Sequence, residues 1–173
     1  MARYERDGGL MRTLQYLFTN VDKGGFSTCI YGRDLKNSWF DGSVLSNCVG
    51  LVWTLFCLDH DPEIAAAVQK CKMKRISGNA RDIYAKAKKT GSGYVCSYAP
   101  KSGSIACYGA GTSAGHVVYL LWVWRDGQAV GIESNYSGNL SNGRLLRVKT
   151  GNPKTWYKEY QGCIYDYTGG GGR

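Results

Sequence analysis

The spacing of apolar residues changes near the middle of the chain, from a helical period to a strand period. Over residues 3–18, leucines recur every three to four positions, which predicts a helix. Further helices are predicted from residue 47 or 48, over 61–75 after the capping sequence Asp-Pro-Glu, and from residue 79 to the sequence "KKTGSG". Residues 19–46 carry turn signals such as "NVDKGG" and "DGS", so we expect loops there.

The C-terminal half instead carries short apolar segments that are typical of strands. The sequence "RDGQ" is a hairpin turn signal between two of them. Helices followed by antiparallel strands predict one α+β domain over residues 1–168, with residues 1–45 as a less defined extension and 169–173 as a glycine-rich tail or linker. The predicted strands are 104–109, 116–124, 128–136, 144–149 and 160–167.

Composition and charge narrow the class of protein. Hydrophobic residues make up 43% of the 173 residues, which is typical of a globular domain and not of a disordered chain. The net charge is +9, from 22 basic and 13 acidic residues, so the surface attracts polyanions such as nucleic acid, acidic membranes or an anionic cell wall. The sequence contains no run of about 18 apolar residues, so no membrane span is predicted. The N-terminus lacks the apolar segment of a signal peptide, so we expect synthesis in the cytoplasm without an export signal.

The cysteines and histidines are the first residues to consider for chemistry. The seven cysteines contain no C-x-x-C pair and no spacing with histidine that matches a zinc site. We therefore expect mostly reduced cysteines, with structural positions for Cys57, Cys96, Cys107 and Cys163. Of the two histidines, His60 lies beside a predicted helix start and is expected to be an exposed loop or capping residue.

His116 opens the most apolar predicted strand, and polar residues of the next strand can reach it. Glu133 and Asn135 are two positions apart, so they project from the same face of a strand. If "RDGQ" closes a hairpin, His116 lies opposite residue 136, within one residue of Asn135 and diagonal to Glu133. Polar side chains on an otherwise apolar hairpin need partners, and the imidazole can supply one. A purely structural histidine fits His116 taken alone equally well.

Cys48 is predicted to begin a helix, where a thiol can serve as a nucleophile. The helix N-terminus and an adjacent imidazolium both stabilise a thiolate, so we expect the pKa of Cys48 to lie well below its ordinary value of about 8.5. The backbone N–H of Cys48 can donate to an oxyanion. Cys57 lies on the opposite side of the same predicted helix and cannot share the site.

These segments resemble the CHAP family, the cysteine, histidine-dependent amidohydrolases/peptidases. This family is a branch of the papain-like cysteine hydrolases and is common in phage endolysins and bacterial wall-remodelling enzymes. The resemblance runs from about Asn47 to Tyr165 and depends on the order of "NCVGLVW", "PKSGSIACY", "AGHVVYLLWV", "IESNYSG" and "YQGCIYD". It implies a papain-like α+β fold, with N-terminal helices packed on a C-terminal antiparallel sheet.

The resemblance also implies an activity, hydrolysis of an amide in peptidoglycan, and a role for each site residue. Cys48 would be the nucleophile and His116 the general base and then the acid. Glu133 would orient His116, and Asn135 would support the histidine or polarise the site. The bond cut would be the N-acetylmuramoyl–L-alanine amide or a bond within the stem peptide or cross-bridge. Three further residues on these segments are expected to contact substrate: Asn47, Trp53 and Tyr136.

The resemblance has two departures that affect metals and partners. Some family members bind calcium through an aspartate-rich loop before the cysteine, but here "NSWFDGSVLSN" has only Asp41 as an acid, and calcium takes six to eight oxygen ligands. We therefore expect no metal and no cofactor. The expected partner is bacterial peptidoglycan of the anionic Gram-positive type, reached after release from a host cell by a phage lysin. A wall-binding domain could be attached at the glycine tail or could assemble with this chain.

Three other functions fit the same residues less fully. Another papain-like enzyme, such as an NlpC-type peptidase or a transacylase, shares the Cys–His order but is less expected to carry Glu-x-Asn. A catalytically inactive wall-binding or interaction module would not depend on Cys48. A nucleic-acid-binding protein would explain the charge and the aromatic residues, but no recognisable nucleic-acid-binding motif is present.

Overall fold

The computed structural model describes residues 29–31, 39–40, 43–44, 47–60, 73, 76–110, 114–134 and 145–168. Its helices are α2 (Cys48–His60), α3 (Ala80–Ala87) and α4 (Pro153–Trp156). Its strands are β1 (Cys29–Tyr31), β2 (Trp39–Phe40), β3 (Ser43–Val44), β4 (Tyr94–Ser97), β5 (Ser104–Tyr108), β6 (His116–Val123), β7 (Ala129–Glu133), β8 (Leu145–Gly151) and β9 (Tyr160–Tyr167).

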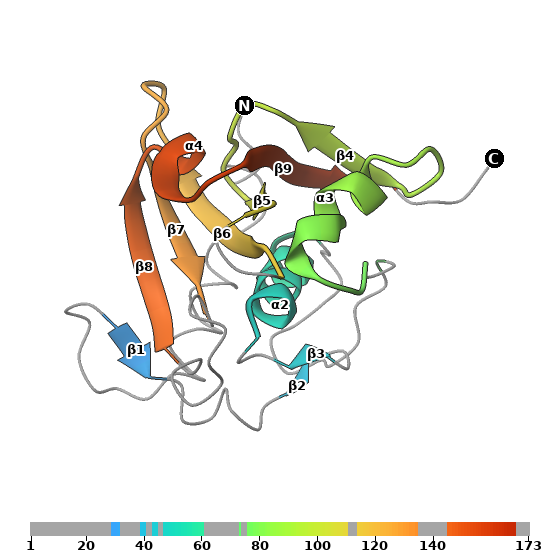
Figure 1. The fold of residues 1–173 in the computed structure, drawn as a ribbon, viewed down its shortest axis with the longest axis horizontal. Coiled ribbons are helices and arrows are strands. Elements are labelled where there is room, and N and C mark those ends of the chain that lie inside the picture. Colours follow the sequence, from blue (N-terminus) through green and yellow to red (C-terminus); the bar gives the residue numbers. More distant parts are fainter. Residues whose placement is uncertain are drawn as a thin grey trace.

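Seven strands form one antiparallel sheet in the order β1-β8-β7-β6-β5-β9-β4 (Figure 1). β2 and β3 pair with each other in a separate two-stranded ribbon. The five strands predicted in the C-terminal half correspond to β5–β9, and the predicted α+β class is confirmed. Successive side chains of a strand point to opposite faces of the sheet, and both faces of this sheet are apolar, so helices can pack on both sides.

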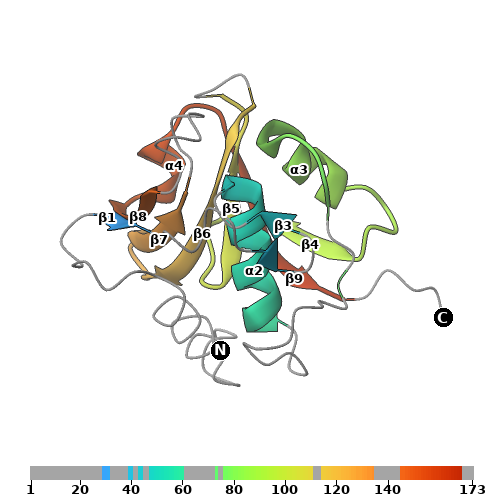
Figure 2. The ribbon, with the colours of Figure 1, turned by 90° about the horizontal axis from the view of Figure 1, so that it is seen from below.

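Helix α2 is the centre of the core and packs against β6, β7 and β5 (Figure 2). Every residue from Leu51 to His60 is buried, because this helix is apolar on nearly all sides. On β6, Val117 and Tyr119 join the core cluster of α2 and α3, whereas Val118 and Leu120 face the opposite side. That second side is covered by the aromatic residues of α4 and the segment after it.

The sequence-based expectations are wrong for several of the short elements. Residues 19–46 were expected to be loops, but they contain β1, β2 and β3. Helix α4 was not predicted, although Asn152 caps it and Pro153 occupies its first position, which is a helix-start signal. The predicted helices over 3–18 and 61–75 lie outside the described residues. Within the part of the chain that the structure describes, no helix is long and apolar enough to cross a bilayer.

Candidate active site

Cys48 is the first residue of α2, and Asn47 caps the helix. The side-chain Oδ1 of Asn47 accepts a hydrogen bond from the Val49 N–H at 2.9 Å, and its carbonyl accepts from the Leu51 N–H at 2.9 Å. Asparagine is among the best capping residues because its side chain satisfies an N–H that the helix leaves unpaired. The predicted helix start is confirmed, and it places the Cys48 thiol at the positive end of the helix dipole.

Burial, and not the helix start, controls the acidity of Cys48. The residue is 8% exposed, and this burial raises the pKa of its thiol to about 11. Backbone N–H groups of Val49, Val117 and Cys48 itself act in the opposite direction, and the Glu133 charge adds to the rise. The expected lowering of the pKa is therefore wrong for this arrangement. The thiol is protonated at neutral pH, so attack on a substrate needs a base that removes the proton.

A thiol with a pKa of about 11 makes a specific prediction for alkylation by iodoacetamide. Only the thiolate reacts, so the rate at Cys48 should rise about tenfold per pH unit between neutral pH and the pKa. Peptide mass spectrometry after timed alkylation would measure this rate. Cys96 gives a matched profile, because burial raises its pKa to about 11 as well. A rate at Cys48 that stays constant below neutral pH would instead indicate a thiolate–imidazolium pair.

His116 and Glu133 form a buried pair on the sheet. His116 is the first residue of β6, Glu133 is the last residue of β7, and their exposed fractions are 1% and 0%. The Nε2–H of His116 donates to Oε2 of Glu133 at 2.9 Å. Because a carboxylate can only accept, this bond fixes the imidazole tautomer and makes Nδ1 the nitrogen that can take up a proton.

A β-bulge in β6 brings Glu133 to the same face of the sheet as His116. Near the turn the strands pair in the predicted register, with Val123 opposite residue 129. On the side of Leu121 away from the turn, the pairing is shifted by one residue, so that Tyr119 pairs with residue 132. The register predicted from the turn alone would place Glu133 opposite Tyr119, on the other face. A one-residue shift reverses the face of every later side chain, so the bulge makes the observed pair possible.

Tyr157, which was not predicted, completes the described site. It follows α4, and its hydroxyl donates to the Glu133 carboxylate, with Oε1 and Oε2 both at 2.7 Å. Its ring contacts the His116 imidazole edge-on, with 5.0 Å between centroids. Neither periodicity nor a motif marks this tyrosine in the sequence, because its contacts depend on the path of the chain after α4.

The residues expected to contact substrate differ in their exposure and in whether the structure describes them. Asn47 is exposed beside Cys48, where its side chain is engaged in capping. Trp53 is 2% exposed and packs edge-on against Phe56, so its position does not support the expected substrate contact. Asn135 and Tyr136 lie outside the described residues. In the ranges that the structure covers, no three histidine, cysteine or acidic side chains are placed to hold a metal ion.

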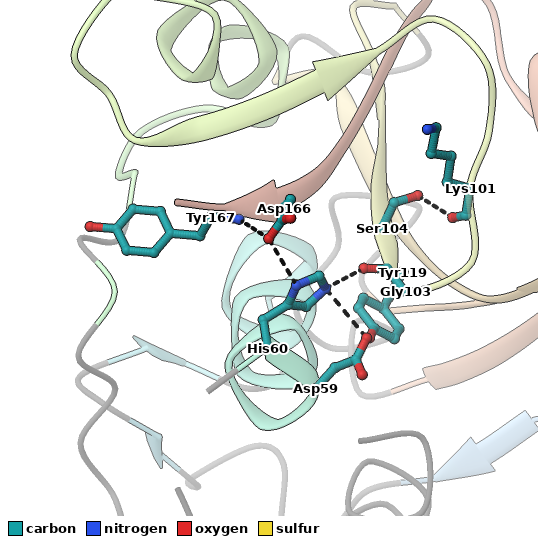
Figure 3. A network of polar contacts seen from close by, with 8 residues as sticks. All are labelled: Asp59, His60, Lys101, Gly103, Ser104, Tyr119, Asp166 and Tyr167. Atoms are coloured by element: carbon teal, nitrogen blue, oxygen red, sulfur yellow. Dashed lines mark hydrogen bonds and ion pairs between the residues drawn. The ribbon is translucent and has the colours of Figure 1, made fainter. Parts of the chain in front are cut away.

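His60 is a structural residue, and the expectation that it is exposed is wrong. It ends α2 with 6% exposure, and its Nε2–H donates to the Gly103 carbonyl at 2.6 Å (Figure 3). Asp59 Oδ2 lies 3.3 Å from the same nitrogen and accepts from the Tyr119 hydroxyl at 2.7 Å. Asp166 Oδ1 lies 4.0 Å from Nδ1 of His60. This network joins α2, β6 and β9 at the end of the helix away from Cys48.

The expectation of mostly reduced cysteines is wrong for Cys57. This residue is disulfide-bonded, and its partner lies outside the described side chains. The free cysteines that the structure describes are Cys48, Cys96, Cys107 and Cys163. Cys107 and Cys163 are fully buried within strands, in agreement with the structural role expected for them. Cys57 is therefore not a usable reference thiol for the reactivity of Cys48.

A thiol at a helix start and an imidazole–carboxylate pair at the sheet are the groups used by hydrolases with a cysteine nucleophile. The model of the CHAP domain matches residues 38–135, which is more than half of the chain, and the chain belongs to this family. The resemblance recognised in the sequence is thereby confirmed. A comparison with curated proteins finds no match.

Two solved structures share the fold. One is a wild-type endolysin, LysIME-EF1, with a TM-score of 0.53 and 18% identity, covering 91% of this chain and 64% of that chain. The other is Ly7917, with a TM-score of 0.54 and 17% identity, covering 91% of this chain and 62% of that chain. This chain therefore spans less than two thirds of the length of either neighbour.

Proposed function

We propose that this protein is a cysteine-dependent peptidoglycan hydrolase that cleaves an amide bond of the bacterial cell wall. The observation that carries the proposal is the buried His116–Glu133 pair beside the helix that Cys48 begins. The Val117 backbone, next to His116 in the sequence, is close enough to the Cys48 sulfur to lower its pKa. Membership of the CHAP family and the fold shared with an endolysin support the choice of substrate.

In the first half of the proposed reaction, Cys48 attacks the carbonyl carbon of the amide. His116 takes the thiol proton at Nδ1 as the S–C bond forms, because burial leaves the resting thiol protonated. The Cys48 N–H stabilises the negative charge that develops on the carbonyl oxygen. The C–N bond then breaks, and His116 returns the proton to the leaving amine, which leaves a thioester on Cys48.

Water completes the reaction by hydrolysing the thioester. His116 removes a proton from the attacking water, the C–S bond breaks, and the proton returns to the Cys48 sulfur. The products are a carboxylate and an amine. Glu133 keeps its charge throughout and stabilises the imidazolium that forms twice in the cycle. Asn135 remains a predicted member of this site.

Digestion of purified Gram-positive peptidoglycan, followed by mass spectrometry of the soluble fragments, tests this proposal. Amide hydrolysis should release new amino groups without new reducing sugar ends. Peptides separated from intact glycan strands would identify an N-acetylmuramoyl–L-alanine amidase, whereas cuts within peptides would identify an endopeptidase. New reducing ends alone, or fragments that form equally after Cys48 is alkylated, would contradict the proposal.

The proposed partner is an anionic Gram-positive wall, which a chain with a net charge of +9 can approach through long-range attraction. We further propose that residues 1–168 act as one catalytic domain and that this domain acts on the wall as part of a phage lysin. The neighbouring structures are longer than this chain, which is consistent with a wall-binding part joined to it or assembled with it.

A further inference from the structure

Tyr157 contacts both members of the His116–Glu133 pair. Its hydroxyl donates to a carboxylate that has no solvent exposure, so it replaces a donor that water would supply at the surface. Its ring packs edge-on against the imidazole, and the Lys149 Nζ lies 4.4 Å from the ring centroid. We propose that Tyr157 is a positioning residue, which holds the Glu133 carboxylate so that Oε2 remains on His116. This inference rests on the proposed function of the pair.

The chain around Tyr157 is fixed on both sides, as a positioning residue requires. Before it, the indole N–H of Trp156 donates to the Thr150 carbonyl at 3.1 Å. After it, the carbonyl of Glu159 accepts from the Gly109 N–H at 3.0 Å. Glu159 has a φ of 56°, in the left-handed region that non-glycine residues rarely adopt. Such a conformation persists only where surrounding contacts impose it, and it directs the chain from α4 back into β9.

The neighbours of Glu133 supply a matched control for the hydroxyl of Tyr157. Glu133 is hydrogen-bonded to His116 and Tyr157, and its charge also raises the pKa of Cys48 and of Tyr108. The Tyr108 hydroxyl donates instead to the carbonyl of Pro153, the first residue of α4, at 2.7 Å. The Tyr108 and Tyr157 rings pack edge-on, 5.2 Å apart. The two phenols therefore share one aromatic cluster, and only one of them donates to Glu133 in the described contacts.

The test compares Tyr157→Phe with Tyr108→Phe, since each removes one hydroxyl and keeps the ring. In Tyr157→Phe, the initial rate of solubilisation of purified Gram-positive wall should fall about tenfold, as expected for loss of a hydrogen bond to a charged group. The acid side of its pH–rate profile should also move to higher pH, because a buried carboxylate with fewer donors takes up a proton more readily. Tyr108→Phe should keep the parent profile and stay within about twofold of the parent rate per folded molecule.

The two proposals can fail separately. An unchanged rate and pH profile in Tyr157→Phe, or equal effects in Tyr108→Phe, would overturn the positioning role while leaving wall hydrolysis intact. If the parent protein does not solubilise wall, the proposed function fails, and the tautomer of His116, measured from the ¹⁵N NMR shifts of its ring, becomes the measurement. Loss of the single Nε2–H tautomer in Tyr157→Phe alone then supports the positioning role, and unchanged tautomers in the three proteins overturn it.

Discussion

Replacing Cys48 with alanine is expected to reduce wall solubilisation at least about a thousandfold, the scale of effect seen when a covalent nucleophile is removed. The proposed reaction forms a thioester on this sulfur, and alanine offers no atom that can form it. The side chain is small and sits at the helix start, so the free energy of unfolding should change by no more than about 1 kcal/mol. Turbidity of a wall suspension and thermal unfolding would measure the two quantities.

Cys96→Ala is the matched control for this substitution. It removes a free thiol whose pKa burial also raises to about 11, but Cys96 lies in β4 at the edge of the sheet. This variant should keep the parent activity within about twofold. Full activity of Cys48→Ala would eliminate the cysteine mechanism and favour an inactive interaction module or a different site.

Replacing His116 with glutamine is expected to lower activity by about a hundred- to ten-thousandfold. The amide of glutamine can still donate to Glu133, so the buried carboxylate keeps a partner and the fold should persist. The amide cannot take up a proton near neutral pH, however, and the Cys48 thiol then has no base. The loss of activity should persist when the rate is expressed per folded molecule.

The second histidine of the chain provides the control, because His60 is also buried and also lies beside a carboxylate. His60→Gln should lower the free energy of unfolding by about 1–3 kcal/mol, since it disturbs a buried hydrogen-bond network that joins α2 to the sheet. Its activity per folded molecule should remain near that of the parent at low temperature. A loss in His60→Gln as large as in His116→Gln would mean that both effects are structural.

Local patterns were enough to predict most of the described fold. Alternating apolar segments identify β5–β9, and the capping residue before Cys48 identifies the start of α2. Both signals depend on residues that are close in the sequence, so they can be recognised without knowledge of the rest of the chain. The two-residue strands β2 and β3 are too short to show a period, and β1 forms only because β8 is available to pair with it.

The site residues also divide into those that local sequence patterns identify and those that they do not. Cys48 and His116 could be selected because each begins a predicted element, and Glu133 because it shares a strand face with Asn135 after the hairpin turn. Trp53 could not be assigned correctly, because an aromatic residue in a helix has the same local pattern whether it faces a cleft or the core. Tyr157 could not be found at all, since its partner Glu133 is brought to it by the order of the strands.

The sequence by itself determined the α+β class, the family and the order along the chain of the residues proposed as nucleophile, base and acid. The tertiary structure decided that His116 and Glu133 meet and that the Cys48 thiol is buried. The bulge at Leu121 moves Glu133 to the face of His116, and a single extra residue in one strand leaves no local signal. Burial raises the pKa of Cys48, where the helix start alone predicts a fall. Register and desolvation both depend on residues distant in the sequence, so only the folded chain specifies them.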